Sequence, residues 1–437
     1  MIKFNENNET ITEKNSAILV GLQIRKDISR FMDELEALTE ADGVEVVGRV
    51  IQLVEKPNKA TLIGSGKVNE LAEMCESMDV DMVIFDEELS GIQLRNLEEA
   101  TGVRVIDRTI LILDIFADRA TSREGKLQVE LAQLQYRKTR LTGFGKSLSR
   151  LGGGIGTRGP GEKKLETDRR HIERRISDIK GELDKVGRDR AVQRAGREKS
   201  GVPVVVLVGY TNSGKSAIMN RLLSMTEKEE KSVQSQDMLF ATLDTQHRKI
   251  SSGPGMEFIL IDTVGFVSKL PHSLIDAFKS TLEEVRDADL LVHIVDGSYS
   301  ERDFQIEITD EVIEQIGTGS IERIMVYNKM DIANEKPVDV SGSEVAYVSA
   351  KTEENMELLL SMIERKIFGS RVETAFLIPY DKGSITSYLC ENAEIISTDY
   401  TDAGTVLKGK FTYEDYERYK TFEIYESMRS EKNDGAV

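Results

Sequence analysis

Residues 204–216 read VVVLVGYTNSGKS and join a run of apolar residues to a glycine-rich phosphate-binding pattern. The apolar run at 204–208 is typical of a buried strand. It leads directly into G-x-x-x-x-G-K-S, in which glycines let backbone N–H groups point at phosphate oxygens. A helix expected from Ala217 onward would direct its positive end at the same anion. The stretch therefore predicts a P-loop between a strand and a helix.

The pattern assigns roles to the residues of this loop. Lys215 would reach the β- and γ-phosphates, and the Ser216 hydroxyl would bind Mg²⁺. The alternative is a glycine-rich turn without a ligand, which the preceding strand makes less favourable. The residues expected to contact the nucleotide here are Gly209, Tyr210, Thr211, Asn212, Ser213, Gly214, Lys215 and Ser216.

Three later motifs follow in the order that a P-loop GTPase requires. Residues 259–266 (ILIDTVGF) end a strand in D-x-x-G, where Asp262 would hold Mg²⁺ through water and the Gly265 amide would sense the γ-phosphate. Residues 324–331 (IMVYNKMD) end another strand in N-K-x-D, and residues 347–351 (YVSAK) end a further one. Because each motif stands at the carboxyl end of an apolar strand, the set favours one nucleotide site at the edge of a parallel sheet.

The N-K-x-D motif argues for guanine. The Asp331 carboxylate can accept hydrogen bonds from both N1–H and N2–H₂ of guanine, and adenine offers no such pair of donors. The guanine-binding residues expected from these two motifs are Asn328, Lys329, Asp331, Ser349, Ala350 and Lys351.

The polar stretch 237–244 is expected to contain the threonine that responds to the γ-phosphate. Thr242 is the hydroxyl expected to close on Mg²⁺ when the γ-phosphate is present, with Thr245 as the second choice and an ordinary loop threonine as the alternative. The expected metal ligands are thus Ser216, Thr242 and Asp262, and the expected catalytic residues are Lys215, Thr242 and Gly265.

Phe266 occupies the position where many GTPases carry a glutamine that orients the attacking water. A phenyl ring cannot do this by hydrogen bonding, so we expect slow intrinsic hydrolysis and a partner that completes the site. Asn212 suggests that K⁺ bound beside the phosphates supplies the missing charge; the alternative is that Asn212 only caps a turn.

Composition limits the classes of protein. A chain of 437 residues has room for several domains. No apolar run approaches the length of a membrane span, the first residues lack a signal-peptide pattern, and Cys75 and Cys390 have no metal-binding spacing. We expect a cytoplasmic monomer with reduced thiols and no metal except Mg²⁺ and the hypothetical K⁺.

Charge is distributed unevenly along the chain. The net charge is −18, yet residues 119–199 carry 22 Lys and Arg against 11 Asp and Glu. Within this block, Leu127, Leu131 and Leu134 form one seam of coiled-coil spacing, and Ile172, Ile176, Ile179 and Leu183 belong to a second. The two seams predict an antiparallel helical hairpin, and the basic excess predicts contact with RNA rather than only a solvated helical face.

The connection between the seams, residues 142–161, has eight glycines and no acidic residue. Such a tip allows backbone to approach phosphates closely, whereas the alternative is a slack linker. The residues expected to contact RNA are Lys146, Arg150, Arg158, Lys163 and Lys164.

The remaining segments predict two flanking α/β parts. Residues 16–117 alternate strands and helices, including a helix at 91–101. I-G-S-G-K at 63–67 is interpreted as a helix start because Thr61 and Val68 break the P-loop pattern, and weak binding of a second nucleotide is the alternative. Residues 370–437 predict strands near 375–379, 393–397 and 404–412 and helices at 383–391 and 413–419. The expected domains are 1–117 (N-terminal α/β), 118–200 (helical hairpin), 201–369 (P-loop GTPase) and 370–437 (small α+β), an α/β fold class overall.

Over roughly residues 61–422 the chain resembles the HflX family of translational GTPases. The resemblance rests on GYTNSGKS, DTVGF and NKMD, and more specifically on VIDRTILILDIFA (105–117), ELAQLQYRKTRL and GGGIGTRGPGEKKLETDRR. It implies the same four domains, binding to the large ribosomal subunit and its rRNA with the glycine-rich tip toward the peptidyl-transferase region, and GTP-dependent splitting of stalled ribosomes. Ala217 and the run DTQHRK (244–249) depart from the usual family pattern.

The function expected from residues and resemblance together is a GTP-hydrolysing, ribosome-binding factor with ribosome-stimulated turnover. Two alternatives from other classes stay open at this stage. One is a regulatory GTP-binding switch that acts on a protein partner, and the other is an RNA-remodelling NTPase that also uses ATP.

Overall fold

The computed structural model describes residues 3–4, 10–11, 15–25, 27–148, 160–226, 245–253, 255–269, 284–338 and 342–424. These residues fall into two compact units. The first contains the described residues up to Ala195 together with residues 264–269. The second contains the described residues from Gly196 to Thr263 and from residue 284 onward.

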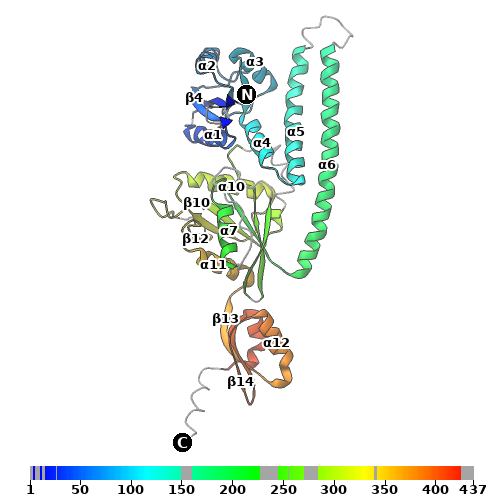
Figure 1. The fold of residues 1–437 in the computed structure, drawn as a ribbon, viewed down its shortest axis with the longest axis vertical. Coiled ribbons are helices and arrows are strands. Elements are labelled where there is room, and N and C mark those ends of the chain that lie inside the picture. The colour runs from blue at the N-terminus through cyan, green and yellow to red at the C-terminus, as the bar shows by residue number, and fades with distance from the viewer. Residues whose placement is uncertain are drawn as a thin grey trace. The chain divides into compact units, whose positions relative to one another are not determined.

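The first unit is built on a parallel four-stranded sheet in the order β4-β3-β5-β6. The strands are β3 (Ser16–Gln23), β4 (Glu45–Leu53), β5 (Met82–Phe85) and β6 (Arg104–Asp107). They alternate with α1 (Ser29–Ala41), α2 (Ser65–Met78), α3 (Gly91–Thr101) and α4 (Arg108–Arg119), as Figure 1 shows. A short antiparallel pair, β1 (Lys3–Phe4) and β2 (Thr10–Ile11), precedes them.

The sheet has a core on each face because successive residues of a strand point in opposite directions. Ala17 and Leu19 of β3 pack in the core formed with α1 and α4, whereas Ile18 and Val20 pack in the core formed with α2 and α3. The helix start predicted at 63–67 is confirmed, since α2 follows Gly64 and its Lys67 pairs with Glu70 at 2.8 Å.

The helical hairpin consists of α5 (Arg123–Leu148) and α6 (Pro160–Ser200). Leu127 and Leu131 pack against Ile179, which confirms the predicted pairing of the two seams. Glu130 pairs with Arg175 at 2.7 Å, and the earlier Arg123 pairs with the later Glu182 at 2.8 Å. Because residues further along α5 meet residues earlier in α6, the two helices run antiparallel (Figure 1).

The second unit contains a six-stranded sheet in the order β12-β11-β10-β7-β9-β8. Its strands are β7 (Val204–Gly209), β8 (Gln246–Gly253), β9 (Met256–Asp262), β10 (Leu290–Asp296), β11 (Arg323–Asn328) and β12 (Glu344–Tyr347), all parallel to their neighbours except β8. The accompanying helices are α7 (Lys215–Thr226), α10 (Arg302–Ile316) and α11 (Met356–Phe368). Residues of α7 and α11 cover one face, and Ile306 of α10 packs on the other.

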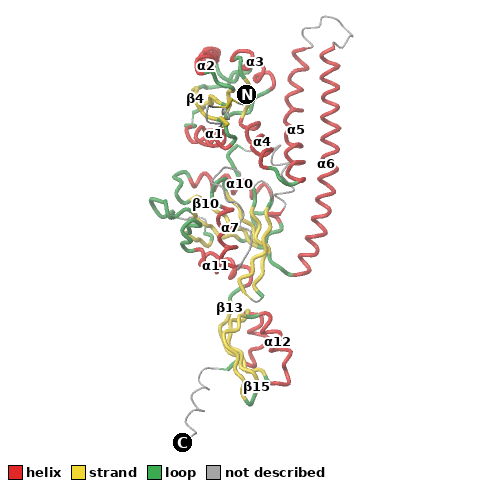
Figure 2. The backbone as a smooth tube through the Cα atoms, viewed as in Figure 1, coloured by secondary structure: helices red, strands yellow, loops and turns green. Residues whose placement is uncertain are grey.

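The C-terminal part is a three-stranded antiparallel sheet in the order β13-β15-β14 (Figure 2). The strands are β13 (Arg371–Ile378), β14 (Glu394–Thr401) and β15 (Gly404–Thr412), and the helices are α12 (Gly383–Asn392) and α13 (Tyr413–Tyr419). Single 3₁₀ turns, η1 (Tyr380–Lys382) and η2 (Lys420–Phe422), flank them. Phe376 and Phe411 form the centre of its core.

The predicted and observed elements agree closely in several places. The helix at 91–101, the strand at 404–412 and the helix at 413–419 have the predicted bounds. The helix after the P-loop begins at Lys215 instead of Ala217, because the phosphate-binding turn already leads into the first helical turn. Among the described helices, none combines the length and apolar character needed to cross a bilayer.

Replacement of Phe411 by alanine should destabilise the C-terminal sheet. The side chain is fully buried, and its ring centroid lies 4.6 Å from that of Phe376. Losing such a residue costs about 3–5 kcal/mol, so hydrogen exchange in β13 and β15 should rise sharply. The matched control Tyr413→Ala removes an exposed ring and should leave exchange nearly unchanged. Equal exchange in both variants would contradict a core centred on Phe411.

Candidate nucleotide-binding site

Polar and glycine residues stand at the carboxyl ends of adjacent parallel strands in the second unit. β7 ends at Gly209, β9 at Asp262, β10 at Asp296 and β11 at Asn328. β7 lies between β9 and β10. The chain passes from β7 to β8 and β9 on one side of it and then crosses to β10 on the other side. In open α/β sheets this switch point, at the carboxyl edge, is where ligands bind.

The loop after β7 has a backbone that only glycine tolerates at two positions. Gly209 has φ +149°, and a Cβ there would lie 2.2 Å from the Ile294 carbonyl oxygen. Gly214 has φ +93°, and its Cβ would lie 2.2 Å from the Asn328 side-chain nitrogen. Asn212, between them, has the left-handed φ of 58°. The turn therefore depends on both glycines of G-x-x-x-x-G.

Lys215 is buried at the start of α7, and its ammonium is held by the loop itself. Nζ donates to the carbonyl oxygens of Gly209 at 3.0 Å and Tyr210 at 2.7 Å. Burial lowers the pKa of Lys215 to about 8, while the Asp262 carboxylate acts in the opposite direction. A phosphate beside this ammonium would favour its charged form, so the geometry suits an anionic ligand.

Ser216 and Asp262 form the candidate metal site. The Ser216 hydroxyl donates to Asp262 Oδ2 at 2.6 Å. A hydroxyl and a carboxylate are the hard oxygen ligands that Mg²⁺ prefers, so the pair fits the ion. The third predicted ligand, Thr242, lies outside the described residues, and Thr245 immediately precedes β8.

Asn328 connects the phosphate loop to the loop after β12. Its Nδ2 donates to the Ser213 carbonyl at 3.0 Å, and its Oδ1 accepts from the Ala350 amide at 3.1 Å. The side chain is buried, which makes these bonds strong structural constraints. The N-K-x-D motif predicts Asn328 only as a guanine-binding residue; its second role, linking two loops, carries no sequence signal.

Asp331 is oriented by a neighbouring motif. Its Oδ1 accepts from the Ser349 hydroxyl at 2.8 Å, and Ser349 Oγ in turn accepts from the Thr352 amide at 3.1 Å. The N-K-x-D and S-A-K motifs are therefore joined through Ser349. This arrangement fixes the carboxylate that is predicted to recognise guanine.

Two further residues of this edge were not predicted. Asp296 at the end of β10 pairs with Lys329 at 2.8 Å, and Lys329 has a left-handed φ of 61°. A carboxylate that ends an apolar strand was the available signal for Asp296. His293 on the same strand is buried, and burial lowers its pKa to about 3, with Arg323 and Lys215 acting in the same direction. The imidazole is therefore neutral at physiological pH.

The structure brings together most of the predicted nucleotide contacts in the second unit. Those at its strand ends and loops are Gly209, Tyr210, Thr211, Asn212, Ser213, Gly214, Lys215, Ser216, Asp262, Asn328, Lys329, Asp331, Ser349, Ala350 and Lys351. Gly265 and Phe266 belong to the first unit. The side chains of the predicted RNA contacts Lys146, Arg150, Arg158, Lys163 and Lys164 lie outside the described part of the chain. The binding roles themselves stay predictions.

Comparison with known proteins covers three consecutive regions. A family model described as GTP-binding GTPase N-terminal matches residues 29–117, and one described as GTP-binding GTPase middle region matches residues 119–197. A third, described as 50S ribosome-binding GTPase, matches residues 204–329.

Whole-chain relatives give the same result. A protein named GTPase HflX from Caldanaerobacter subterraneus subsp. tengcongensis is 46% identical over 416 residues, which is 95% of each chain. GTPase HflX from Escherichia coli K12 is 40% identical over 377 residues, 85% of this chain and 87% of that one. The crystal structure of a GTP-binding protein from Sulfolobus solfataricus in complex with GDP covers 81% of this chain and 98% of its own, with 25% identity and a TM-score of 0.42. The identities to the HflX proteins, over nearly the full length, confirm the resemblance seen in the motifs, and the chain belongs to the HflX family of P-loop GTPases.

Proposed function

We propose that this GTPase binds the large ribosomal subunit in its GTP form and acts in splitting or rescuing stalled ribosomes. The observation that carries the proposal is the basic helical hairpin, in a chain whose GTPase region matches the model described as 50S ribosome-binding GTPase. Ribosomal RNA is a polyanion, and an exposed excess of Lys and Arg is the feature that binds one.

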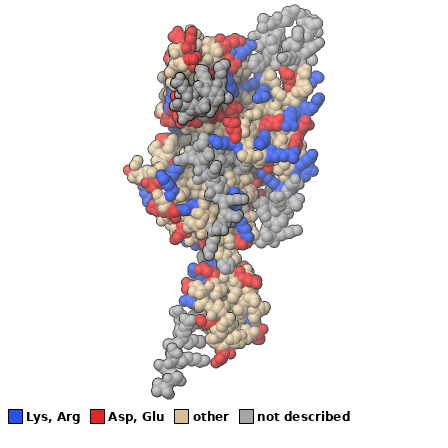
Figure 3. Space-filling model, viewed as in Figure 1, with Lys and Arg blue, Asp and Glu red and all other residues tan. Residues whose placement is uncertain are grey.

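The hairpin retains positive charge after its internal ion pairs are counted. Several basic residues are neutralised within it, such as Arg175 by Glu130 at 2.7 Å. Exposed basic side chains with no acidic partner among the described residues are Arg174, Lys180 and Lys185. Figure 3 shows Lys and Arg gathered along this part of the molecule, with acidic side chains between them. These residues are available to phosphates, whereas the paired ones hold the helices together.

In this proposal, the bound nucleotide controls the conformation of the protein. Asp331 selects guanine, Lys215 binds the terminal phosphates, and Ser216 and Asp262 hold Mg²⁺. Mg²⁺ bound there would neutralise developing charge on the phosphate oxygens. Thr242 and the Gly265 amide respond to the γ-phosphate, and its loss on hydrolysis releases the GTP-specific conformation. Turnover is slow without the ribosome because Phe266 offers no hydrogen bond to water.

The proposal is tested by measuring GTP turnover with and without purified large subunits. We expect large subunits to raise the turnover rate and small subunits alone to leave it unchanged. Equal turnover under all three conditions would contradict the proposed partner.

The variant Asp331→Asn should change base preference. It removes the charge from the carboxylate that would accept two guanine N–H groups, and a charge-assisted hydrogen bond is worth about 1.5–3 kcal/mol. GTP affinity should therefore fall at least about tenfold, while xanthosine triphosphate gains relative to GTP because its 2-carbonyl accepts from the new amide. Calorimetric titration measures both. The control Asp399→Asn, at an exposed position in β14, should bind GTP normally, and an unaltered preference in Asp331→Asn would refute the assignment.

The double variant Arg150→Glu, Arg158→Glu should weaken binding to large subunits without changing GTP affinity. Fewer phosphate contacts release fewer counterions, so the fall of affinity with added salt should also become less steep. Lys56→Glu, Lys59→Glu makes the same charge change at exposed positions of the first unit. If that control loses as much ribosome affinity as the hairpin variant, the effect is one of net charge and the hairpin assignment fails.

A potassium ion beside the phosphates is part of the proposal. Asn212 is exposed and has a left-handed backbone, which leaves its side-chain oxygen accessible to a cation next to the phosphates. Turnover should be faster in potassium than in sodium buffer at equal ionic strength, and Asn212→Ala should abolish the difference. Identical rates of the unaltered protein in the two salts would rule the ion out.

A further inference from the structure

The motif V-I-D-R-T at 105–109 takes no part in the nucleotide site, yet it places two buried charges side by side. Asp107 is the last residue of β6 and Arg108 is the first residue of α4. Both are buried in the first unit. Their side chains bind different segments of that unit. Because the two residues are adjacent in the chain, a single peptide bond links the two sets of contacts.

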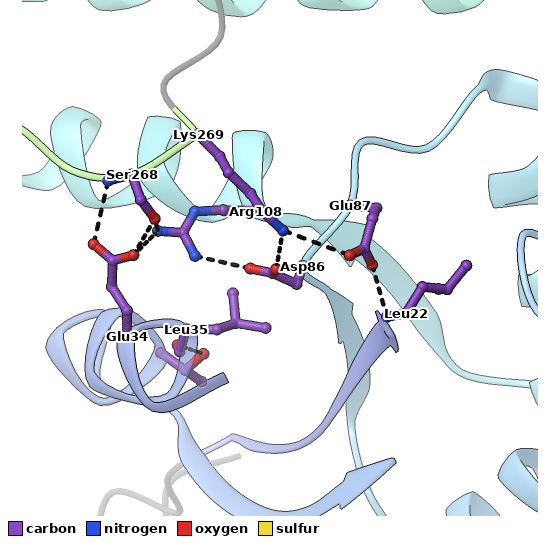
Figure 4. Close-up of polar contacts among 9 residues, drawn as sticks. Leu22, Glu34, Leu35, Asp86, Glu87, Arg108, Ser268 and Lys269 are labelled. Atoms are coloured by element: carbon purple, nitrogen blue, oxygen red, sulfur yellow. Dashed lines mark hydrogen bonds and ion pairs between the residues drawn. The ribbon is translucent and has the colours of Figure 1, made fainter. Parts of the chain in front are cut away.

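Arg108 binds the segment that contains Gly265. Its guanidinium donates to Asp86 Oδ1 at 2.8 Å, to Glu34 Oε2 at 2.6 Å and to the Ser268 hydroxyl at 3.0 Å. The Ser268 amide also donates to Glu34 Oε1 at 3.3 Å, and its hydroxyl donates to the same carboxylate. Figure 4 shows Arg108 between the two carboxylates, with Ser268 next to it.

Lys269 adds a second cation to this cluster. Its ammonium binds Asp86 and lies 3.5 Å from Glu87 Oε1. Burial raises the pKa of Glu87, and Lys269 opposes that shift. On the apolar side, Val264 and Val267 pack in the core shared by α1, α4 and α5. Residues 264–269 are therefore held in the first unit by both charge and packing.

Releasing this segment would leave buried carboxylates short of partners. The Asp86 side chain is fully buried and the Glu34 side chain is 13% exposed. Breaking a buried ion pair by removing one partner leaves an uncompensated buried charge and is strongly destabilising. Any movement of residues 264–269 must therefore be accompanied by rearrangement around Arg108, because the carboxylates cannot remain as they are.

Asp107 binds α5 by accepting hydrogen bonds from it. Its Oδ2 accepts from the Tyr136 hydroxyl at 2.5 Å, from Arg140 at 2.6 Å and from the Leu89 amide at 2.8 Å, while Oδ1 caps α4 through the Ile110 amide at 3.1 Å. The Arg140 guanidinium lies 3.0 Å from the centre of the Tyr136 ring. α5 is the helix that leads into the glycine-rich tip of the hairpin.

We propose that Asp107 and Arg108 form a relay that couples the position of residues 264–269 to that of α5, so that the nucleotide state reaches the hairpin through this pair. The γ-phosphate acts on Gly265, the Arg108 cluster follows Ser268 and Lys269, and the shift of the α4 N-terminus changes the Asp107 contacts with Tyr136 and Arg140. Both are positioning residues. The relay rests on the D-x-x-G assignment and is independent of the ribosomal role.

The test is hydrogen exchange of the full chain bound to GDP or to a non-hydrolysable GTP analogue, without ribosomes. In the unaltered protein, exchange at 264–269 and in α5 around Tyr136 and Arg140 should differ between the two nucleotides. Arg108→Gln should abolish the difference in α5. Tyr136→Phe keeps the buried ring and removes only the Tyr136 bond to Asp107, leaving that of Arg140; it should reduce the α5 difference and preserve the one at 264–269. Both variants should still bind both nucleotides.

Arg49→Gln is the matched control, because Arg49 forms a partly exposed ion pair with Asp33 at 2.6 Å in the same unit. It should retain the differences in both segments. The relay is refuted if α5 exchanges equally with the two nucleotides in the unaltered protein, or if its nucleotide dependence is undiminished in Tyr136→Phe. Stimulation of turnover by large subunits is a separate measurement, so either proposal can fail alone.

Discussion

The direction of parallel strands is the constraint on which this protein depends. Parallel strands present their carboxyl ends at one edge of a sheet, and in both units several polar residues with identifiable tasks stand there. In the second unit these are Gly209, Asp262 and Asn328, and in the first they are Asp107 and, directly after β5, Asp86. The same architecture thus forms a nucleotide site in one unit and a charged cluster around Arg108 in the other.

Buried cations hold the key loops of each unit. Lys215 is bound by the carbonyl oxygens of its own loop, and Arg108 is bound by two carboxylates and a serine hydroxyl. A buried charge is costly unless it is paired and hydrogen-bonded, so Lys215 and Arg108 hold their partners in place. Lys215 and Arg108 differ in which of their contacts a ligand can replace. A phosphate can replace the carbonyl contacts of Lys215, whereas the partners of Arg108 come from distant parts of the same chain.

Most of the architecture could be predicted because its signals are local. An apolar strand before G-x-x-x-x-G-K-S, and leucine and isoleucine seams such as Leu127 and Ile179, need only a short window of sequence. The Arg108 cluster could not be predicted, since Glu34, Asp86 and Ser268 meet only after the chain has folded. The same holds for the tie from Asn328 to Ser213. The roles of the site residues and the four-domain division stay predictions, and Thr242 lies outside the described residues.

The proposed control of the basic helical hairpin by a guanine nucleotide concerns ribosome affinity more directly than GTP turnover. By linkage, a ribosome that prefers the GTP form must also tighten binding of GTP over GDP by the same factor. The most direct measurement is the dissociation constant for purified large subunits at one fixed salt concentration, with the protein loaded either with GDP or with a non-hydrolysable GTP analogue. We predict distinctly tighter binding with the analogue. The same dissociation constant in both nucleotide states would contradict the account.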